Sequence, residues 1–288
     1  MASTPASVPP PNVEFTIEPP RFLLRIDGRE LWRFRDLFLV LAWRDVSVRY
    51  KQTALGALWA IFQPLVTMLI FTFVFHRMAN VQSGDGTPYP VFLYLGLLVW
   101  QYYSGTVTKA SESMVENQNM VQKVYFPRLV LPASTALVGF VDLAFASVVL
   151  AGVMAWFGYA PHWQGIAILP ILLATLLLSA LGLGLFFSSL NVKYRDVRYA
   201  LPFLIQTLMY VTPVIYPVRM LDPYPLAKAL MVWLNPIAGV VTNLRAGLLG
   251  AQPIDWPMMA ISFGMSVVFF LGGLYVFRST ERYFADIV

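Results

Sequence analysis

The sequence predicts an all-α integral membrane protein with six transmembrane helices, an N-terminal amphipathic interface helix and re-entrant helices between spans five and six. First, 58% of the 288 residues are hydrophobic and only 12% are charged, whereas about 25% are charged in a soluble domain. Second, several long windows contain no Asp, Glu, Lys or Arg, and roughly 18 such residues make a candidate transmembrane helix. Third, these windows are continuous and rich in Leu, unlike the ~10-residue alternating strands of a barrel. The charge-free windows are 52–76, 86–108, 143–192, 199–218 and 256–277.

The region before the first span divides into two segments. Residues 1–20 hold six prolines and no cation, so they predict a disordered arm and not a signal peptide, which would begin with basic residues. Residues 21–51 predict an amphipathic segment in the membrane interface, with aromatic side chains inward and arginines at the headgroups. A first span that begins early is the alternative interpretation. The apolar face is formed by Leu31, Phe34, Phe38 and Leu41.

Residues 52–288 are assigned to a six-helix transmembrane domain. Its charge-free windows are separated by short polar loops, and the turn between the third and fourth spans contains no Lys or Arg. The predicted spans are 54–75, 90–107, 130–157, 166–187, 200–216 and 257–277.

The distribution of Lys and Arg predicts the orientation, because cytoplasmic loops carry an excess of both residues. Sixteen of the 20 lie in residues 21–51, in the loops after spans two and four, and in the C-terminal tail. Both termini are therefore expected in the cytoplasm. The same clustering at span edges argues against nucleic acid as a partner. The four cations expected on the other side are Arg77, Arg219, Lys228 and Arg245.

Two short apolar pieces lie between spans five and six, at about 226–234 and 237–249. Each is too short to cross a bilayer, and Asn235 and Pro236 separate them, since proline ends a helical run. The pattern predicts a re-entrant hairpin on the outer side, which must be buried in protein or line a cavity. A peripheral loop with two surface helices is the alternative.

Residues that could carry catalysis are scarce. The absence of a Gly-Lys dipeptide excludes a P-loop, and the absence of cysteine excludes thiolate chemistry. His76 and His162 each stand alone, so we expect neither a metal site nor an enzyme. Asp142 is the one acid well inside a predicted span. Such a charge must face a polar partner, the bundle interior or water; structural pairing with a neighbouring helix is favoured over a role in transport.

Aromatic rings in or beside the spans form a further group of candidates. Rings of this kind pack against sugar faces, and they also form interfacial belts and ordinary core. For any single ring the belt or core interpretation is favoured. The candidates for a channel or substrate contact are Trp59, Phe62, Trp100, Tyr102, Tyr103 and Tyr210.

Four segments, taken together and in order, resemble the membrane (permease) subunit of type-2 ABC exporters of bacterial polysaccharides. The nearest group within that family exports O-antigen, teichoic acid and related capsular glycans. The resemblance covers about residues 30–285, and any one segment alone would be weak. The segments are "RDVSVRYKQTALGALWAIFQPL", "ENQNMVQKVYFPRLVLP", "KYRDVRYALPFLIQTLMYVTPVIYP" and "LNPIAGVVTNLR".

The resemblance implies a homodimer in which each copy docks a separate ABC ATPase subunit, so ATP and Mg would be bound by that partner and no cofactor by this chain. It implies a glycan on an undecaprenyl-pyrophosphate-type lipid as cargo, moved across the bacterial inner membrane. The loop after span two would carry the coupling and gate helices, and the loop after span four would touch the same ATPase. The matching residues are Glu112, Glu116, Asn117, Lys123, Tyr194, Arg195, Asp196 and Arg198, and the outer hairpin matches Asn235 and Pro236.

A basic collar near the N-terminus suits the phosphates of such a lipid, because arginine binds phosphate oxygens with two parallel hydrogen bonds. Plain anchoring to anionic membrane lipid is the simpler interpretation and is favoured. A related exporter of a drug or a small lipid, and a secondary transporter or channel, remain as alternative functions. The collar comprises Arg29, Arg33, Arg35, Arg44, Arg49 and Lys51.

Overall fold

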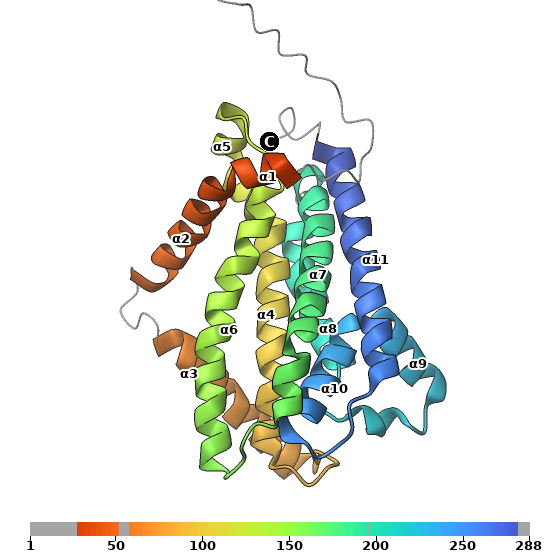
Figure 1. Ribbon diagram of the computed structural model, residues 1–288. Coiled ribbons are helices and arrows are strands. Elements are labelled where there is room, and N and C mark those ends of the chain that lie inside the picture. Colours follow the sequence, from red (N-terminus) through yellow and green to blue (C-terminus); the bar gives the residue numbers. More distant parts are fainter. Residues whose placement is uncertain (1–27, 52–57, 195, 282–288) are drawn as a thin grey trace, which may run out of the picture.

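The computed structural model describes residues 28–51, 58–194 and 196–281, and within this part the chain is helical (Figure 1). The predicted arm, residues 1–20, lies outside the described residues. The long apolar windows form the long helices, and Pro, Asn and Gly residues separate them. In chain order the helices are α1 (Gly28–Arg33), α2 (Arg35–Lys51), α3 (Leu58–Phe71), η1 (Thr72–Met78), α4 (Tyr89–Glu116), α5 (Gln118–Lys123), α6 (Val130–Trp156), α7 (Trp163–Lys193), α8 (Val197–Val211), η2 (Val218–Leu221), α9 (Pro225–Leu234), α10 (Pro236–Leu249) and α11 (Trp256–Glu281).

Helix α4 forms the centre of the bundle and packs against α6 and α7, while α11 packs on α7. Most of its side chains are buried, and Tyr94 and Tyr103 are among the largest fully buried ones. A helix that is apolar all round belongs inside a protein. The window 90–107 therefore forms the core, and the helix continues beyond the predicted end to Glu116.

Length and composition qualify four helical stretches as candidate membrane spans, and a bent pair, α9 with α10, would raise the number to five at most. This confirms an all-helical, multi-pass architecture, whereas the count of six spans stays a prediction. Two predicted spans fall outside the four: α4, with its polar second half, and α8, which has only 15 residues. The four stretches are Ile61–Met78, Val130–Trp156, Trp163–Lys193 and Trp256–Glu281.

The predicted fifth span, 200–216, is shorter than expected because α8 ends at Val211. The chain then turns, and the Thr212 hydroxyl donates to the Leu208 carbonyl and accepts a hydrogen bond from Asn235. Pro213 and Pro217 follow, and neither can continue a helical hydrogen-bond pattern. The residues after Val211 are thus held by other parts of the fold.

The N-terminal segment forms two helices, α1 and α2, and not one continuous helix. Leu41 is buried, and Phe34 and Phe38 pack against the same cluster, which includes Met114 of α4 and Phe126. The predicted apolar face therefore contacts protein, because the C-terminal end of α4 and the N-terminal end of α6 offer an apolar surface there. A second apolar set on α1 and α2 remains exposed, namely Trp32, Leu39, Val40, Trp43 and Val48.

Helices α7 and α11 approach closely through paired glycines. A Cβ atom on Gly182 would overlap the backbone of Phe269 and Phe270, and one on Gly273 would overlap the backbone of Gly182. Small residues let two membrane helices come into backbone contact, where van der Waals packing holds them together. Similar contact between Gly165 of α7 and Gly247 of α10 brings the bent pair against the bundle.

The bent pair confirms the predicted break at Asn235 and Pro236. Helices α9 and α10 meet at 97°, and Asn235 caps α10 by accepting a hydrogen bond from the Ile237 amide at 3.1 Å. Pro236 occupies the first position of α10, where its missing N–H costs nothing. Helix α10 is largely buried against α7, α11 and α4, which fits a hairpin held in protein better than a peripheral loop.

The two ends of the bundle are formed by different helices. Helices α1 and α5, together with the C-terminal end of α11, lie at one end, and the bent pair lies near the other (Figure 1). The segments that carry most Lys and Arg thus share an end, as predicted. One cation counted for the opposite end, Arg245, is buried inside the protein and belongs to no loop.

Candidate functional site: a polar pocket beside α2

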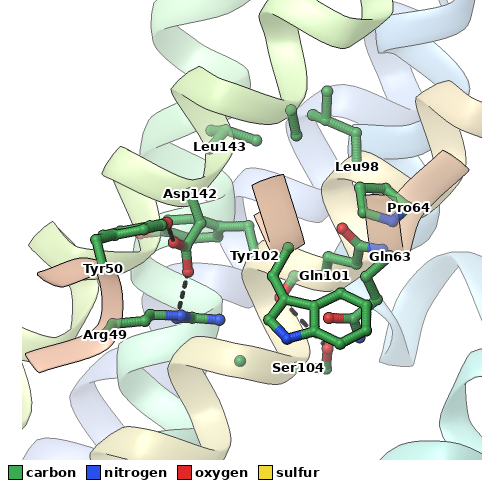
Figure 2. A pocket seen from close by; sticks show the side chains of 13 residues that line it. Arg49, Tyr50, Gln63, Pro64, Leu98, Gln101, Tyr102, Ser104, Asp142 and Leu143 are labelled. Carbon is green, nitrogen blue, oxygen red and sulfur yellow. Dashed lines mark hydrogen bonds and ion pairs between the residues drawn. The ribbon is translucent and has the colours of Figure 1, made fainter. Parts of the chain in front are cut away.

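A pocket of about 570 Å³ lies where the end of α2 meets α3, α4 and α6. Its lining combines charged, amide and aromatic side chains with apolar ones. Figure 2 shows side chains from these four helices converging on it. The lining residues are Arg49, Tyr50, Trp59, Gln63, Pro64, Leu98, Gln101, Tyr102, Ser104, Gly105, Asp142, Leu143 and Ala146.

Asp142 of α6 is the acidic centre of this pocket, and it is paired. Its Oδ2 accepts a hydrogen bond from Arg49 Nη1 at 2.5 Å, and its Oδ1 accepts one from the Tyr50 hydroxyl (Figure 2). Burial and the hydrogen bond to Asp142 raise the pKa of Tyr50, so its hydroxyl stays a donor. Asp142 is thus paired with a neighbouring helix, as expected, and the absence of a role in transport stays a prediction.

Helix α2 slants away from α6 toward its C-terminal end (Figure 1). The long side chains of Arg49 and Tyr50 bridge this separation to reach Asp142. The positive charge of Arg49 compensates the negative charge of the Asp142 carboxylate, which would be costly to bury alone. The bridge makes the end of α2 a wall of the pocket.

The rest of the polar wall comes from α3 and α4. Gln63 precedes the kink residue Pro64, while Gln101 and Ser104 lie on successive turns of α4. The Tyr102 hydroxyl is buried and makes no hydrogen bond within the described part of the chain. This set offers donors, acceptors and a carboxylate. The pocket can therefore bind a polar group.

The six candidate aromatics separate into three groups. Trp59 and Tyr102 line the pocket, and the Phe62 ring lies 5.6 Å from that of Trp59 between centroids. Trp100 and Tyr103 are buried in the core, which is the core interpretation. Tyr210 is half exposed on α8 and does not line the polar pocket. The sequence could not separate Trp100 and Tyr103 from the pocket residue Tyr102, because all three lie on the charge-free window 86–108.

The six residues of the predicted collar are exposed, but they are spread along α1 and α2. Only Arg49 lines the polar pocket. Arg44 bonds to Asp45 and donates to Asn117 Oδ1 at 3.1 Å, while Arg35 pairs weakly with Asp36 at 3.6 Å. The collar is therefore a row of partly compensated charges, and phosphate binding by it stays a prediction. Its remaining members are Arg29, Arg33 and Lys51.

The predicted coupling segment is not a separate loop, because it consists of the end of α4 and the short helix α5. Glu112 and Glu116 lie in the last turns of α4, where Lys109 contacts both carboxylates at 3.7 and 3.6 Å. Asn117 ends α4, and its amide donates to the Ser113 carbonyl at 2.8 Å. Lys123 is exposed at the end of α5. The Arg44–Asn117 hydrogen bond joins this segment to α2, a contact that no spacing in the sequence signals.

The second predicted docking segment, between α7 and α8, presents Tyr194, Asp196 and Arg198 at the surface; Arg195 lies outside the described residues. Behind it, Asn191 is buried and donates to the Ser111 carbonyl of α4 at 3.0 Å. The two predicted docking segments thus adjoin through the ends of α4 and α7.

A functional residue that sequence reasoning missed is Arg245 of α10. Its guanidinium donates to the carbonyls of Phe92, Pro213 and Val214 at 3.0, 2.7 and 2.5 Å, and it lies 3.4 Å from the Phe92 ring centroid. It therefore ties the bent pair to α4 and to the turn after α8. In the sequence, Arg245 is visible only as a single arginine within an apolar segment. The distribution of Lys and Arg therefore placed it among the cations of the outer loops.

Comparison with known families identifies the class of this protein. The model of the ABC-2 type transporter family matches residues 36–249, which include the candidate pocket, both predicted docking segments and the bent pair. The chain belongs to this family. It is accordingly a multi-pass membrane subunit that does not itself catalyse a reaction, and it works with an ATPase, which accounts for the missing P-loop.

Among characterised relatives, the chain is similar to O-antigen export system permease proteins RfbA. It is 27% identical over 260 residues to that of Myxococcus xanthus, covering 90% of this chain and 97% of the relative. It is 26% identical to one from Klebsiella pneumoniae, covering 88% and 95%. A weaker similarity, 22% identity covering 83% and 91%, joins it to the polysialic acid transport protein KpsM of Escherichia coli.

Proposed function

We propose that this chain is the permease subunit of an ATP-driven exporter of a lipid-linked polysaccharide, such as O-antigen on an undecaprenyl-pyrophosphate-type carrier. The observation that carries the proposal is the end-to-end similarity to O-antigen export permeases, which covers 90% of this chain and 97% of the relative. The second relative named for a polysaccharide, the polysialic acid transport protein, points to the same chemical class of cargo.

The candidate pocket supports a glycan over an apolar cargo. Its wall carries two glutamines, a serine and the paired Asp142, and Trp59 presents an aromatic face. Sugar hydroxyls need donors and acceptors, and sugar C–H faces pack against aromatic rings. Arg49 and Arg44 of the collar would attract the pyrophosphate of the carrier.

In this proposal two copies form the pore, and each binds one ATPase subunit, where ATP and Mg are held. The docking surface would consist of α5, the end of α4 and the segment 194–198. ATP binding would close the ATPase subunits together, and the ends of α4 and α7 would carry that motion to the spans. Such coupling is a shift of population between conformers.

We further propose that the protein resides in the bacterial inner membrane with both termini in the cytoplasm. The excess of Lys and Arg at the end that holds α1 and α5 supports this orientation. The bent pair would then lie on the far side as a re-entrant hairpin. Accessibility labelling of a cysteine at Asn119 or at Lys228, in a chain that has no native cysteine, tests this. Asn119 should react only from inside, and the reverse pattern would contradict the proposed orientation.

The cargo is tested by reconstituting the permease with its ATPase in vesicles. Lipid-linked polysaccharide should stimulate ATP hydrolysis and appear on the outer face, while drugs and short-chain lipids should do neither. Stimulation by drugs alone would instead favour the rival function, export of a drug or a small lipid. Transport without any ATPase subunit would overturn the assignment to an ATP-driven exporter altogether.

A further inference from the structure

A second cavity, of about 500 Å³, lies between α2 and α6 on the other side of Tyr50. We call it the α2–α6 groove. Tyr50 lines both cavities, and its ring lies 5.5 Å from that of Phe145 between centroids. Because Tyr50 stands between them, the groove and the polar pocket are separate sites. The apolar walls are formed by Leu39, Trp43 and Val46 of α2 and by Leu137, Val141 and Phe145 of α6.

Two polar groups accompany these apolar walls. Lys51 lines the groove at the last residue of α2, with its Nζ 5.9 Å from the Trp43 ring centroid; within the described part of the chain it forms no ion pair. Ser47 also lines the groove, and its Oγ is buried without a hydrogen-bond partner among the described residues. A helical serine usually bonds to a carbonyl of the preceding turn. The groove therefore offers one uncompensated positive charge and one unsatisfied hydroxyl.

We propose that the α2–α6 groove binds one anionic glycerophospholipid of the surrounding bilayer. An acyl chain would lie between α2 and α6, the phosphate would meet Lys51, and the Ser47 hydroxyl would donate to an ester carbonyl. This site goes beyond the proposed export function, since it holds for any cargo. It rests on the membrane location of the family and on the composition of the groove.

Charge favours a phospholipid over the carrier of the cargo. Arg49, the nearest other cation, is neutralised by Asp142 on the far side of Tyr50, so the groove itself presents the single charge of Lys51. One positive charge matches the single phosphodiester of a glycerophospholipid, whereas a pyrophosphate carries more negative charge. Lysine with a neighbouring tryptophan is typical of residues that lie at the level of lipid headgroups.

The position of α6 explains why bilayer lipid would reach the groove. Helix α6 is a candidate span, and only 28% of its most apolar window is buried in the protein, so much of its surface faces lipid. Exposed Val148 on the same helix illustrates this. A lipid seated in the groove would fill the space that the slant of α2 opens. It would hold α2 in the position from which Arg49 and Tyr50 reach Asp142.

The test uses the permease purified with its ATPase subunit, and native mass spectrometry counts the lipids retained. The probes are phosphatidylglycerol, phosphatidylcholine and undecaprenyl phosphate. Val141→Trp fills the groove, and Val148→Trp makes the same change on the exposed side of α6. Lys51→Gln removes the charge with little change in volume, and Lys228→Gln is its control near the opposite end of the molecule. Thermal unfolding and ATPase co-purification verify folding.

The wild type, Val148→Trp and Lys228→Gln should each retain phosphatidylglycerol in preference to phosphatidylcholine. Val141→Trp should lose it, and Lys51→Gln should bind it about fivefold more weakly, the contribution typical of one lysine at an anionic surface. Equal retention by Val141→Trp, or no preference for the anionic lipid, would overturn the proposal. Displacement of phosphatidylglycerol from the wild type by undecaprenyl phosphate, together with loss of undecaprenyl phosphate binding in Val141→Trp, would assign the groove to the cargo instead.

Discussion

Arg49 Nη1 lies 2.5 Å from Asp142 Oδ2, so the last turn of α2 is anchored to α6 across 93 positions of sequence. This contact lines a polar pocket, and the adjacent Tyr50 lines both that pocket and an apolar groove. A second contact, between Arg44 and Asn117, fixes α2 to the junction of α4 and α5. Helix α2 is therefore held at one point near the predicted docking surface and at another beside the candidate cargo pocket.

Removing Arg49 and Asp142 together should cost less than the sum of the separate losses. In a double-mutant cycle with Arg49→Gln and Asp142→Asn, we expect a coupling of about 1 kcal/mol, since Arg49 is half exposed and solvent weakens the pair. Thermal unfolding of the purified complex measures the coupling, and cargo-stimulated ATP hydrolysis reports its effect on function. Strict additivity of the two single changes would show that the ion pair does not hold α2.

Asn117→Ala should weaken the communication between α2 and the predicted docking surface. It removes the acceptor for Arg44 and the amide that bonds to the Ser113 carbonyl. We expect cargo-stimulated ATP hydrolysis to fall by about fivefold, the equivalent of about 1 kcal/mol, with unstimulated hydrolysis unchanged. Gln82→Ala, at an exposed position in the loop after η1, is the control and should behave as the wild type. Equal effects of the two changes would contradict a specific role for Asn117.

Arg245→Met should destabilise the protein severely, because it leaves three carbonyl groups without their donor. Each hydrogen bond to a charged group contributes about 1.5 kcal/mol or more, and buried carbonyls that lose a partner add a further penalty. Arg245→Lys should not restore stability, since a lysine cannot reproduce the planar fork of donors. Arg219→Met is the control, as Arg219 is exposed and makes one long contact to the Gly84 carbonyl at 3.4 Å. Wild-type melting temperature in Arg245→Met would refute this role.

Gly273→Leu and Gly272→Leu should differ sharply although the two positions are adjacent. Gly273 lies against the backbone of Gly182, whereas a side chain at Gly272 meets nothing within 4 Å. The first change should force α7 and α11 apart at a cost of about 1–3 kcal/mol or more, and the second should be tolerated. The amount of monodisperse protein extracted from membranes and its melting temperature measure the difference. Similar behaviour of both variants would mean that the helices do not pack through Gly273.

Much of the fold could be predicted from composition and the placement of charge. The windows 130–157, 166–187 and 257–277 became α6, α7 and α11 within a few residues of their expected ends, since a long apolar run in a membrane protein has few alternatives to a helix. The break at Asn235 was also predictable, because proline enforces it locally. The windows 90–107 and 200–216 were predicted less well, as α4 is longer and α8 shorter than hydropathy indicates.

The site was harder to predict than the spans. Asp142 was singled out correctly as a group that needs a partner, but nothing in the sequence indicated that Arg49 and Tyr50 would provide it. Among six aromatics of similar appearance, two line the pocket while Trp100 and Tyr103 are core. Arg245 was counted among the cations of the outer loops, whereas it is buried in the structure. Each of these outcomes depends on which side of a helix faces which neighbour, and a charge-free window has no polar pattern that would reveal this.

By itself, the sequence determined that the chain is a helical membrane protein, that its cations gather at one end, and that it has no P-loop with which to hydrolyse ATP. Those properties follow from hydrophobicity, local backbone chemistry and residue counts, which act without reference to distant parts of the chain. Only the tertiary structure decided that α2 is tied to α6 through Arg49 and Asp142, that Tyr50 divides two cavities, and that Arg245 ties the bent pair to α4 and to the turn after α8. These are contacts between residues that lie 31 to 153 positions apart, and their partners are selected by how the helices pack.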